Sequence, residues 1–203
     1  MHVDFWFEFG STYSYPAAMR VEDEARARGA TVRWRPFLLG PIFRSQGWTD
    51  SPFNIYPVKG RYMWRDLGRI CAQQGLELRH PSRFPRNGLL AARLVARFED
   101  QPWIASFVRA IYCANFAEDR EISDPAVVAS VLEAIKQDPS LIAQAETDEA
   151  KSRLRARTDE AGALGIFGAP SFVVDGELFW GNDRLESALE WVARGARSAP
   201  GTT

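Results

Sequence analysis

The sequence predicts an α/β fold in which strands at both ends of the chain flank a long helical middle section. Three observations support this prediction. Residues 3–9 and 31–35 alternate apolar and polar side chains, which is the period of a β-strand. Between residues 38 and 165 the apolar residues recur every three or four positions, as in helices. Alternation returns after Pro170, in two short runs separated by Asp175-Gly176.

The first strand leads through a tight turn into a helix and then into the second strand. Gly10-Ser11-Thr12 forms the turn, and helix-forming residues run from Ala17 to Arg28. Gly29 lies where glycine commonly ends a helix. Thr31 to Arg35 then completes a β-α-β unit, for which a parallel pair with a right-handed crossover is expected.

The middle section is expected to hold at least four helices and one long loop. Two helix starts are predicted, at Gln101 before Pro102 and at Asp124 before Pro125, because a polar cap followed by proline is typical of a first turn. Residues 38–56 are rich in glycine and proline and are interpreted as an irregular loop, and loops of this length are often functional.

The end of the chain predicts a hairpin and a final helix. Asp-Gly between two apolar runs is a strong hairpin signal. Asn182 or Asp183 is expected to cap the last helix, with Glu186 completing a capping box.

The composition and net charge indicate which class of molecule the protein binds. The chain has 203 residues, of which 46% are apolar, and its 25 Lys and Arg nearly balance 26 Asp and Glu, for a net charge of −1. No partner among nucleic acids or membranes is therefore expected, and a small molecule is the default. The start lacks the features of a signal peptide, so a cytoplasmic location is expected. Cys71 and Cys113 match neither a disulfide framework nor a metal site, and no metal is expected.

Three short motifs could carry chemistry, and each has an ordinary structural alternative. Ser11 lies where a helix N-terminus attracts an anion, although Ser11 or Thr12 could simply cap the helix. Ala169-Pro170 precedes a strand, where a trans bond is the usual form. Trp180 and Asn182 precede the last predicted helix, where Asn182 could simply be the N-cap and Trp180 an aromatic residue packed on it.

The order of these motifs resembles the thioredoxin fold of the DsbA-like and kappa-class glutathione transferase families, and more narrowly the 2-hydroxychromene-2-carboxylate isomerases. The resemblance covers nearly the whole chain, with one departure: Thr12 stands where that family usually has proline. The residues that carry the resemblance are Asp4-Phe5 through Phe9, Ser11-Thr12-Tyr13-Ser14-Tyr15, Phe167-Gly168-Ala169-Pro170-Ser171-Phe172 and Phe179-Trp180-Gly181-Asn182-Asp183-Arg184-Leu185.

The resemblance implies a domain organisation. It implies a thioredoxin-like domain built from residues 1–37 and 166–203, interrupted by an inserted helical domain at residues 38–165. It also implies a homodimer.

The resemblance further implies glutathione as cofactor and a small aromatic carboxylate as substrate. Ser11 is the implied catalytic residue, and the residue before Pro170 is implied to take a cis bond. The implied glutathione-binding residues are Ser11, Ala169, Pro170, Trp180, Asn182 and Asp183. Arg44 and Asn54 are candidates for the substrate carboxylate and Phe84 for a pocket wall, with Lys59 and Arg61 as further candidates, although each arginine could be a solvated surface charge.

Ser11 and Ser14 stand where thioredoxin-type oxidoreductases have their two redox cysteines, so dithiol chemistry is excluded at this site. The sulfur would then come from glutathione, held as a thiolate. Lowering a thiol pKa of about 8.5 by 1.5 to 2 units needs about 2–3 kcal/mol. A hydrogen bond from Ser11 plus a helix N-terminus is of that size. Glutathione-dependent isomerisation is the expected function, and a kappa-like glutathione transferase or a noncatalytic glutathione- or peptide-binding protein are the alternatives.

Overall fold

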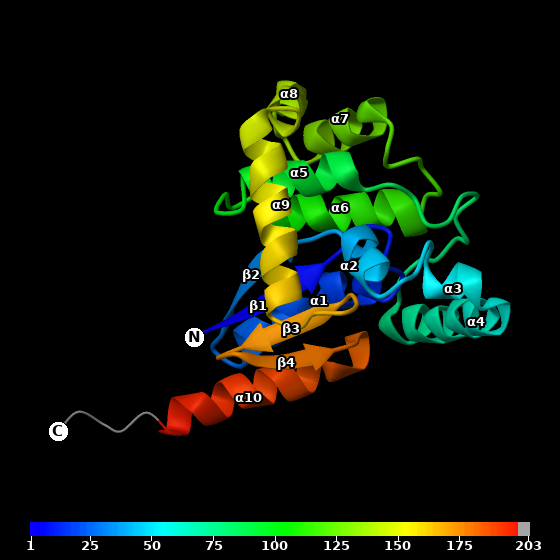
Figure 1. Cartoon of the computed structure of the whole chain (residues 1–203). Coiled ribbons are helices and arrows are strands. Elements are labelled where there is room, and N and C mark those ends of the chain that lie inside the picture. The colour runs from blue at the N-terminus through cyan, green and yellow to red at the C-terminus, as the bar shows by residue number, and fades with distance from the viewer. Residues whose placement is uncertain (199–203) are drawn as a thin grey trace.

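A computed structural model describes residues 1–198 of the chain (Figure 1). Four strands form one mixed sheet in the order β2-β1-β3-β4, and helices surround it. The elements in chain order are β1 (His2–Phe7), α1 (Ser14–Ala27), β2 (Thr31–Pro36), α2 (Leu39–Ser45), α3 (Pro52–Ile55), α4 (Pro57–Gln74), α5 (Leu89–Arg97), α6 (Ile104–Phe116), α7 (Pro125–Ala134), η1 (Pro139–Leu141), α8 (Ile142–Ala145), α9 (Asp148–Ala163), β3 (Ser171–Val174), β4 (Glu177–Trp180), η2 (Asn182–Arg184) and α10 (Leu185–Ser198).

The strand pairing confirms the predicted β-α-β start and the hairpin. β1 runs parallel to β2 and antiparallel to β3, and β3 pairs with β4. Asp175 and Gly176 have φ angles of 49° and 85°. Two positive φ angles in a two-residue turn match the twist of a hairpin, and they suit Asp-Gly.

Each face of the sheet has its own hydrophobic core, because strand side chains alternate between the faces. Phe5 and Phe7 belong to the larger core, which includes residues of α1, α6 and α10. Trp6 lies in a smaller core with Ile42 of α2 and Ala161 of α9. Helices therefore cover both faces of β1, the central strand that leads to Ser11.

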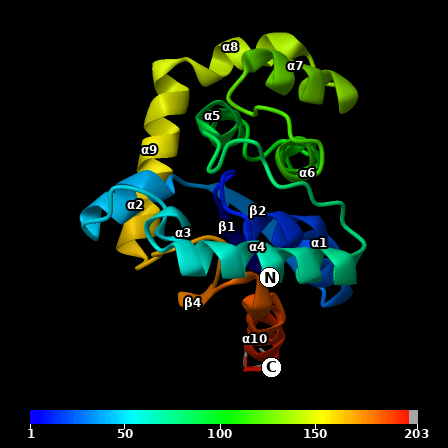
Figure 2. The same ribbon diagram turned by 90° about the vertical axis from the view of Figure 1, so that its right-hand side faces the viewer.

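The helices between β2 and β3 extend the larger core. Figure 2 shows α5 and α6 nearly end-on above β1 and β2, whereas α10 lies below β4. α5 contacts both β2 and α9, and residues of α5, α6 and α7 share one cluster with the strands. Among the described residues, no helix combines the length and the apolar character that a membrane crossing requires.

Several helix boundaries differ from the predictions. α1 begins at Ser14 rather than at Ala17, and α6 begins at Ile104 rather than beside Pro102. The predicted irregular loop at residues 38–56 contains two short helices, α2 and α3. The helix start at Asp124 is confirmed, since its carboxylate accepts a hydrogen bond of 2.8 Å from the Ala126 amide.

The predicted cap of the last helix is wrong. Asn182 and Asp183 lie inside η2, and Gly181 precedes it with no side-chain cap. Glu186 does not complete a capping box, because it pairs with Arg20 of α1. Arg20 also donates to the carbonyl oxygen of Asn182 at 2.6 Å. An ionic contact with another helix thus replaces the local cap.

Candidate active site

The sheet register gathers four segments at one end of the sheet. Trp6 pairs with Ser171, and Ser171 pairs with Trp180. The end of β1 therefore lies beside the start of β3 and the end of β4. As a consequence, the turn at residues 8–11 faces residues 167–170 and 181–183, although more than 150 positions separate them along the chain.

A cavity of about 1060 Å³ opens among these segments. Except for Asn54 and Arg61, all of the predicted site residues line it: Ser11, Arg44, Lys59, Phe84, Ala169, Pro170, Trp180, Asn182 and Asp183. Asn54 does not line it, because its side chain lies on α3 and donates to both carboxylate oxygens of Asp50, at 3.2 and 3.1 Å. The structure thus brings together residues from both ends of the chain and from the helical middle section.

Ser11 contacts the segment before β3 directly. Its hydroxyl donates a hydrogen bond of 2.9 Å to the carbonyl oxygen of Ala169. The Ala169–Pro170 bond is cis, as the family resemblance implies and as the local sequence alone does not. Neither Ser11 nor Thr12 caps α1, since the Thr12 hydroxyl donates to the sulfur of Met63 at 2.8 Å. The capping alternative for Ser11 is therefore wrong.

The turn after β1 leaves amide donors at the start of α1. The Ser11 amide donates to the Glu8 carbonyl at 2.9 Å. The amides of Thr12 and Tyr13 have no hydrogen-bond partner within the part of the chain that the structure describes. Such amides carry the partial positive charge of a helix N-terminus. An anion bound beside this turn could thus accept hydrogen bonds from the Ser11 hydroxyl and from these amides.

α4 holds the turn from the other side. The Thr12 hydroxyl reaches Met63, and the Tyr13 hydroxyl donates to Asp66 at 3.0 Å. Burial and the nearby Asp66 carboxylate raise the pKa of Tyr13 well above its ordinary value. Tyr13 is therefore a neutral hydrogen-bond donor at physiological pH. Thr12, where the related isomerases usually have proline, adds a contact to α4.

Two aromatic side chains form one rim of the cavity. Trp180 is 52% exposed, and its ring lies edge-on to Phe167 with 4.7 Å between the centroids. The indole also packs on Gly168, where a Cβ atom would lie only 2.4 Å from the indole nitrogen. Gly168 is thus required for the close approach of Trp180 to the segment before Pro170.

Arg20 orients the side chain of Asn182, which lies next to Trp180 in the cavity wall. Its guanidinium contacts both the carbonyl oxygen and the side-chain oxygen of Asn182, at 2.6 and 3.3 Å. Because the side-chain oxygen of Asn182 faces Arg20, the amide NH₂ is left as the group free to serve the cavity. Asn182 is nearly buried, so this orientation is fixed by its surroundings.

Arg44 of α2 and Lys59 of α4 bring positive charge to the cavity. Neither forms an ion pair with any residue that the structure describes, whereas Arg184 pairs with Asp183 at 3.3 Å. The Lys59 ammonium lies 5.0 Å from the ring centroid of Tyr56. Arg44 and Lys59 are therefore the cations available to a carboxylate ligand. Arg61 does not line the cavity.

Sequence reasoning missed Glu8 and Arg86, which also line the cavity. The Glu8 carboxylate accepts a hydrogen bond of 2.9 Å from the Gly10 amide. Burial raises the pKa of Glu8 from its usual 4.5 to about 7. A carboxylate at the end of a buried strand, three residues before Ser11, is the signal that could have identified it.

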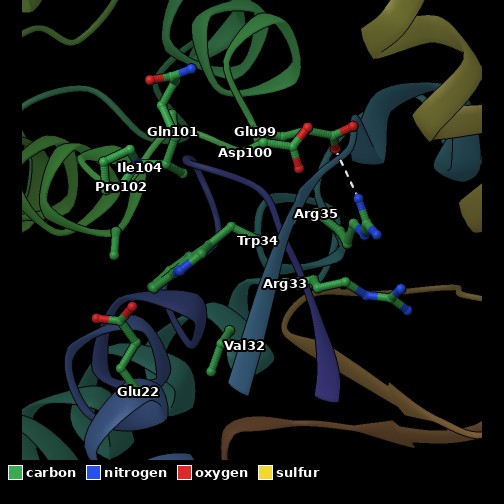
Figure 3. A pocket seen from close by; sticks show the side chains of 11 residues that line it. Glu22, Val32, Arg33, Trp34, Arg35, Glu99, Asp100, Gln101, Pro102 and Ile104 are labelled. Atoms are coloured by element: carbon green, nitrogen blue, oxygen red, sulfur yellow. Dashed lines mark hydrogen bonds and ion pairs between the residues drawn. The ribbon is translucent and has the colours of Figure 1, made fainter. Parts of the chain in front are cut away.

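A second, smaller cavity of about 300 Å³ lies beside β2 (Figure 3). Most of its charged side chains pair with protein groups: Arg35 donates to Glu99 at 2.8 Å, and Glu22 pairs with Arg109. None of the predicted site residues lines it. We therefore take the larger cavity as the candidate active site.

The cysteines lie outside this site. Cys71 is buried and Cys113 is partly buried, and neither lines the larger cavity. Burial raises the pKa of the Cys71 thiol to about 11, so it is protonated at neutral pH. Among the described residues, those that line the larger cavity therefore include Ser11, shortly before α1, and no sulfur-containing side chain.

This fold and its cis-proline site define a class. Residues 2–192 match the profile of the DSBA-like thioredoxin domain, so the chain belongs to that family. Its relatives include isomerases and glutathione transferases. It is 30% identical to the 2-hydroxychromene-2-carboxylate isomerase of Sphingobium xenophagum, over 91% of this chain and 94% of the relative. It is 26% identical to glutathione S-transferase kappa 2 of Caenorhabditis elegans, over 94% and 91% of the two chains.

A solved structure shows the same architecture. The structure of a 2-hydroxychromene-2-carboxylate isomerase superposes with a TM-score of 0.88 at 25% identity, and the match covers 100% of both chains. The resemblance drawn from the sequence motifs is therefore confirmed at the level of family and fold. The predicted thioredoxin-like fold with a large helical insertion is confirmed with it.

Proposed function

We propose that this protein is a glutathione-dependent isomerase acting on 2-hydroxychromene-2-carboxylate or a related aromatic carboxylate of the benzylidenepyruvate type. The observation that carries the proposal is the placement of the Ser11 hydroxyl, 2.9 Å from the Ala169 carbonyl beside a cis proline, in a large cavity with unpaired cations. The names of the relatives support the same reaction class.

The donors around Ser11 fit a thiolate from glutathione. When bound, glutathione supplies a thiolate that adds reversibly to an unsaturated carbon of the substrate and leaves unchanged. Ser11 donates a hydrogen bond to the negative charge, and the Thr12 and Tyr13 amides add to it. Ala169 offers its backbone beside the cis bond, while Trp180, Asn182 and Asp183 hold the rest of the tripeptide.

The cations of the cavity fit an aromatic carboxylate. Arg44 and Lys59, which form no ion pair with the described residues, would bind the substrate carboxylate. Phe84 forms part of the wall, and its ring lies edge-on to Trp64 at 5.0 Å. A cavity of about 1060 Å³ is large enough to hold a tripeptide and an aromatic acid together.

A kappa-like glutathione transferase is the second candidate, because two kappa-class enzymes of Caenorhabditis elegans are 26% and 25% identical to this chain. The two functions differ in their use of glutathione. We expect purified protein to convert 2-hydroxychromene-2-carboxylate only when glutathione is present, while the concentration of free thiol stays constant. Loss of one thiol per product would support the transferase. Binding of glutathione with no conversion of chromene, benzylidene or electrophilic substrates would support a noncatalytic binding protein.

A further inference from the structure

The cavity contains a carboxyl group that the proposed function leaves unused, that of Glu8. Its Oε2 accepts from the Gly10 amide at 2.9 Å, and its carbonyl accepts from the Ser11 amide at 2.9 Å. Glu8 and Ser11 are therefore the first and last residues of one tight turn. We propose that Glu8 accepts the proton that leaves the glutathione thiol, so that the carboxyl group and the sulfur share one proton. This inference rests on the proposed function.

No cation holds Glu8 in its charged form. Tyr112 of α6 donates its hydroxyl to the Glu8 carbonyl oxygen at 2.9 Å, which leaves the carboxylate untouched. The buried Arg86 directs its guanidinium to Asn115 and Asp119 instead. Within the described part of the chain, Glu8 forms no ion pair. The other charged residues around the cavity are Arg44, Asp50, Lys59, Asp66, Asp183 and Arg184.

This environment brings the pKa of the Glu8 carboxyl group close to that of the bound glutathione thiol. Burial raises the pKa of Glu8 to about 7, against hydrogen bonds from Gly10 and Ser11 that lower it. A thiol whose pKa of about 8.5 is lowered by about 1.5 to 2 units reaches nearly the same value. Two such groups exchange a proton at little cost. The exchange also keeps the net charge of the site constant, which avoids placing a second negative charge in a buried region.

The proton is conserved over a reaction cycle. Glu8 gains one O–H bond as the S–H bond breaks, and the electron pair of that bond stays on sulfur. Glu8 returns the proton when the sulfur is released from the product. No external base and no net proton are needed, which agrees with an isomerisation that consumes nothing.

The test is to count the protons released when glutathione binds. Calorimetry in buffers of different ionisation enthalpy gives this number for the wild type and for Glu8→Gln. At about pH 7.5, where a free thiol is still mostly protonated, we expect release close to zero for the wild type and close to one for the variant. Glutamine has nearly the same size, and its oxygen can still accept from the Gly10 amide, so the turn is retained.

Two controls isolate the carboxyl group. S-methylglutathione has no thiol proton, so its binding should release equal numbers of protons from the wild type and from Glu8→Gln. Asp66→Asn removes another carboxylate of the same cavity, one already engaged by Tyr13. Its proton release with glutathione should equal that of the wild type.

Equal proton release by the wild type and Glu8→Gln would overturn the inference. Release of about one proton from the wild type would do so by itself, so the test stands even if the variant does not fold. The ultraviolet absorbance of bound thiolate separates the two proposals. Thiolate that forms in the wild type with full proton release contradicts only the role of Glu8. Absence of thiolate from the wild-type complex contradicts the proposed function as well.

Discussion

At the scale of single residues, the Ser11 hydroxyl must change partners during binding. It has one proton, which it donates to the Ala169 carbonyl in this structure. A thiolate therefore gains a charge-assisted hydrogen bond of about 1.5–3 kcal/mol at the expense of a neutral one of about 1 kcal/mol. The net gain is about 1–2 kcal/mol, which corresponds to about one unit of thiol pKa.

Ser11→Ala should accordingly raise the pKa of bound glutathione by about one unit, measured from thiolate absorbance against pH. The rate at about pH 7 should fall about 3- to 5-fold, because a thiol pKa that rises from about 6.5–7 to about 7.5–8 leaves that much less thiolate. Ser14→Ala is the matched control, because Ser14 is fully buried and does not line the cavity. Equal thiol pKa values for the two variants would show that the Ser11 hydroxyl does not act on the sulfur.

The limits of prediction at this scale come from side-chain partners that no sequence pattern specifies. Ser11 and Ala169 could be placed together because their motifs resemble a known family. The sequence predicts Asn54 as a substrate residue, but its side-chain amide donates to the carboxylate of Asp50, four residues earlier. The placement of Arg86 depends on partners in α6 and the loop after it, which no local pattern indicates.

At the scale of elements, local signals predicted the strands, the hairpin and the start of α7. Alternation, Asp-Gly and an aspartate before proline each act within a few residues, so they can be identified without the rest of the fold. α2 and α3 were missed because Pro41 and Pro52, interpreted as loop residues, lie in their first turns. Proline in a first turn loses no hydrogen bond, and it therefore begins a helix as readily as it interrupts one.

The segment before β3 gives a prediction at this scale. In Gly168→Ala the new methyl group would collide with the Trp180 indole, which is free to move because it is half exposed. Losing its edge-on contact with Phe167 costs about 0.5–1.5 kcal/mol. If Trp180 holds glutathione as proposed, binding should weaken by about 2- to 10-fold in calorimetry, and tryptophan fluorescence should change.

Gly162→Ala is the control for that substitution. Gly162 lies in α9, and its added methyl group would meet only Ile42, at 3.8 Å. Alanine favours a helix over glycine by up to about 1 kcal/mol, so this variant should keep its glutathione affinity and gain slight stability. Unchanged glutathione binding in Gly168→Ala as well would mean that the position of Trp180 does not matter for the cofactor.

At the scale of the whole molecule, the site exists only because the two ends of the chain share one sheet. β1 lies between β2, the next strand along the chain, and β3, which follows more than 130 residues later. The parallel β1–β2 pair could be predicted from its short crossover, whereas the β1–β3 register could not be derived from local patterns. That register brings Ser11 to Pro170, and it also buries Glu8 at the end of β1.

Burial of Glu8 should make the stability of the whole protein depend on pH. Glu8 has a pKa of about 7 when folded and its usual 4.5 when unfolded, so the folded state binds more protons between these values. Stability therefore falls as the pH rises through this window, by about 3 kcal/mol from this group. Glu8→Gln removes this contribution. As the pH rises from about 4.5 to above 7, the free energy of unfolding of the variant, relative to that of the wild type, should therefore increase by the same amount.

Urea unfolding at several pH values between about 4.5 and 8 measures this difference. Glu133→Gln is the control, because Glu133 is exposed on α7 and its side chain makes no hydrogen bond or ion pair with the residues that the structure describes. Its stability should follow that of the wild type at every pH. A constant difference between Glu8→Gln and the wild type over the whole range would show that Glu8 titrates alike in both states. The carboxyl group would then lack the raised proton affinity that its role beside the thiol requires.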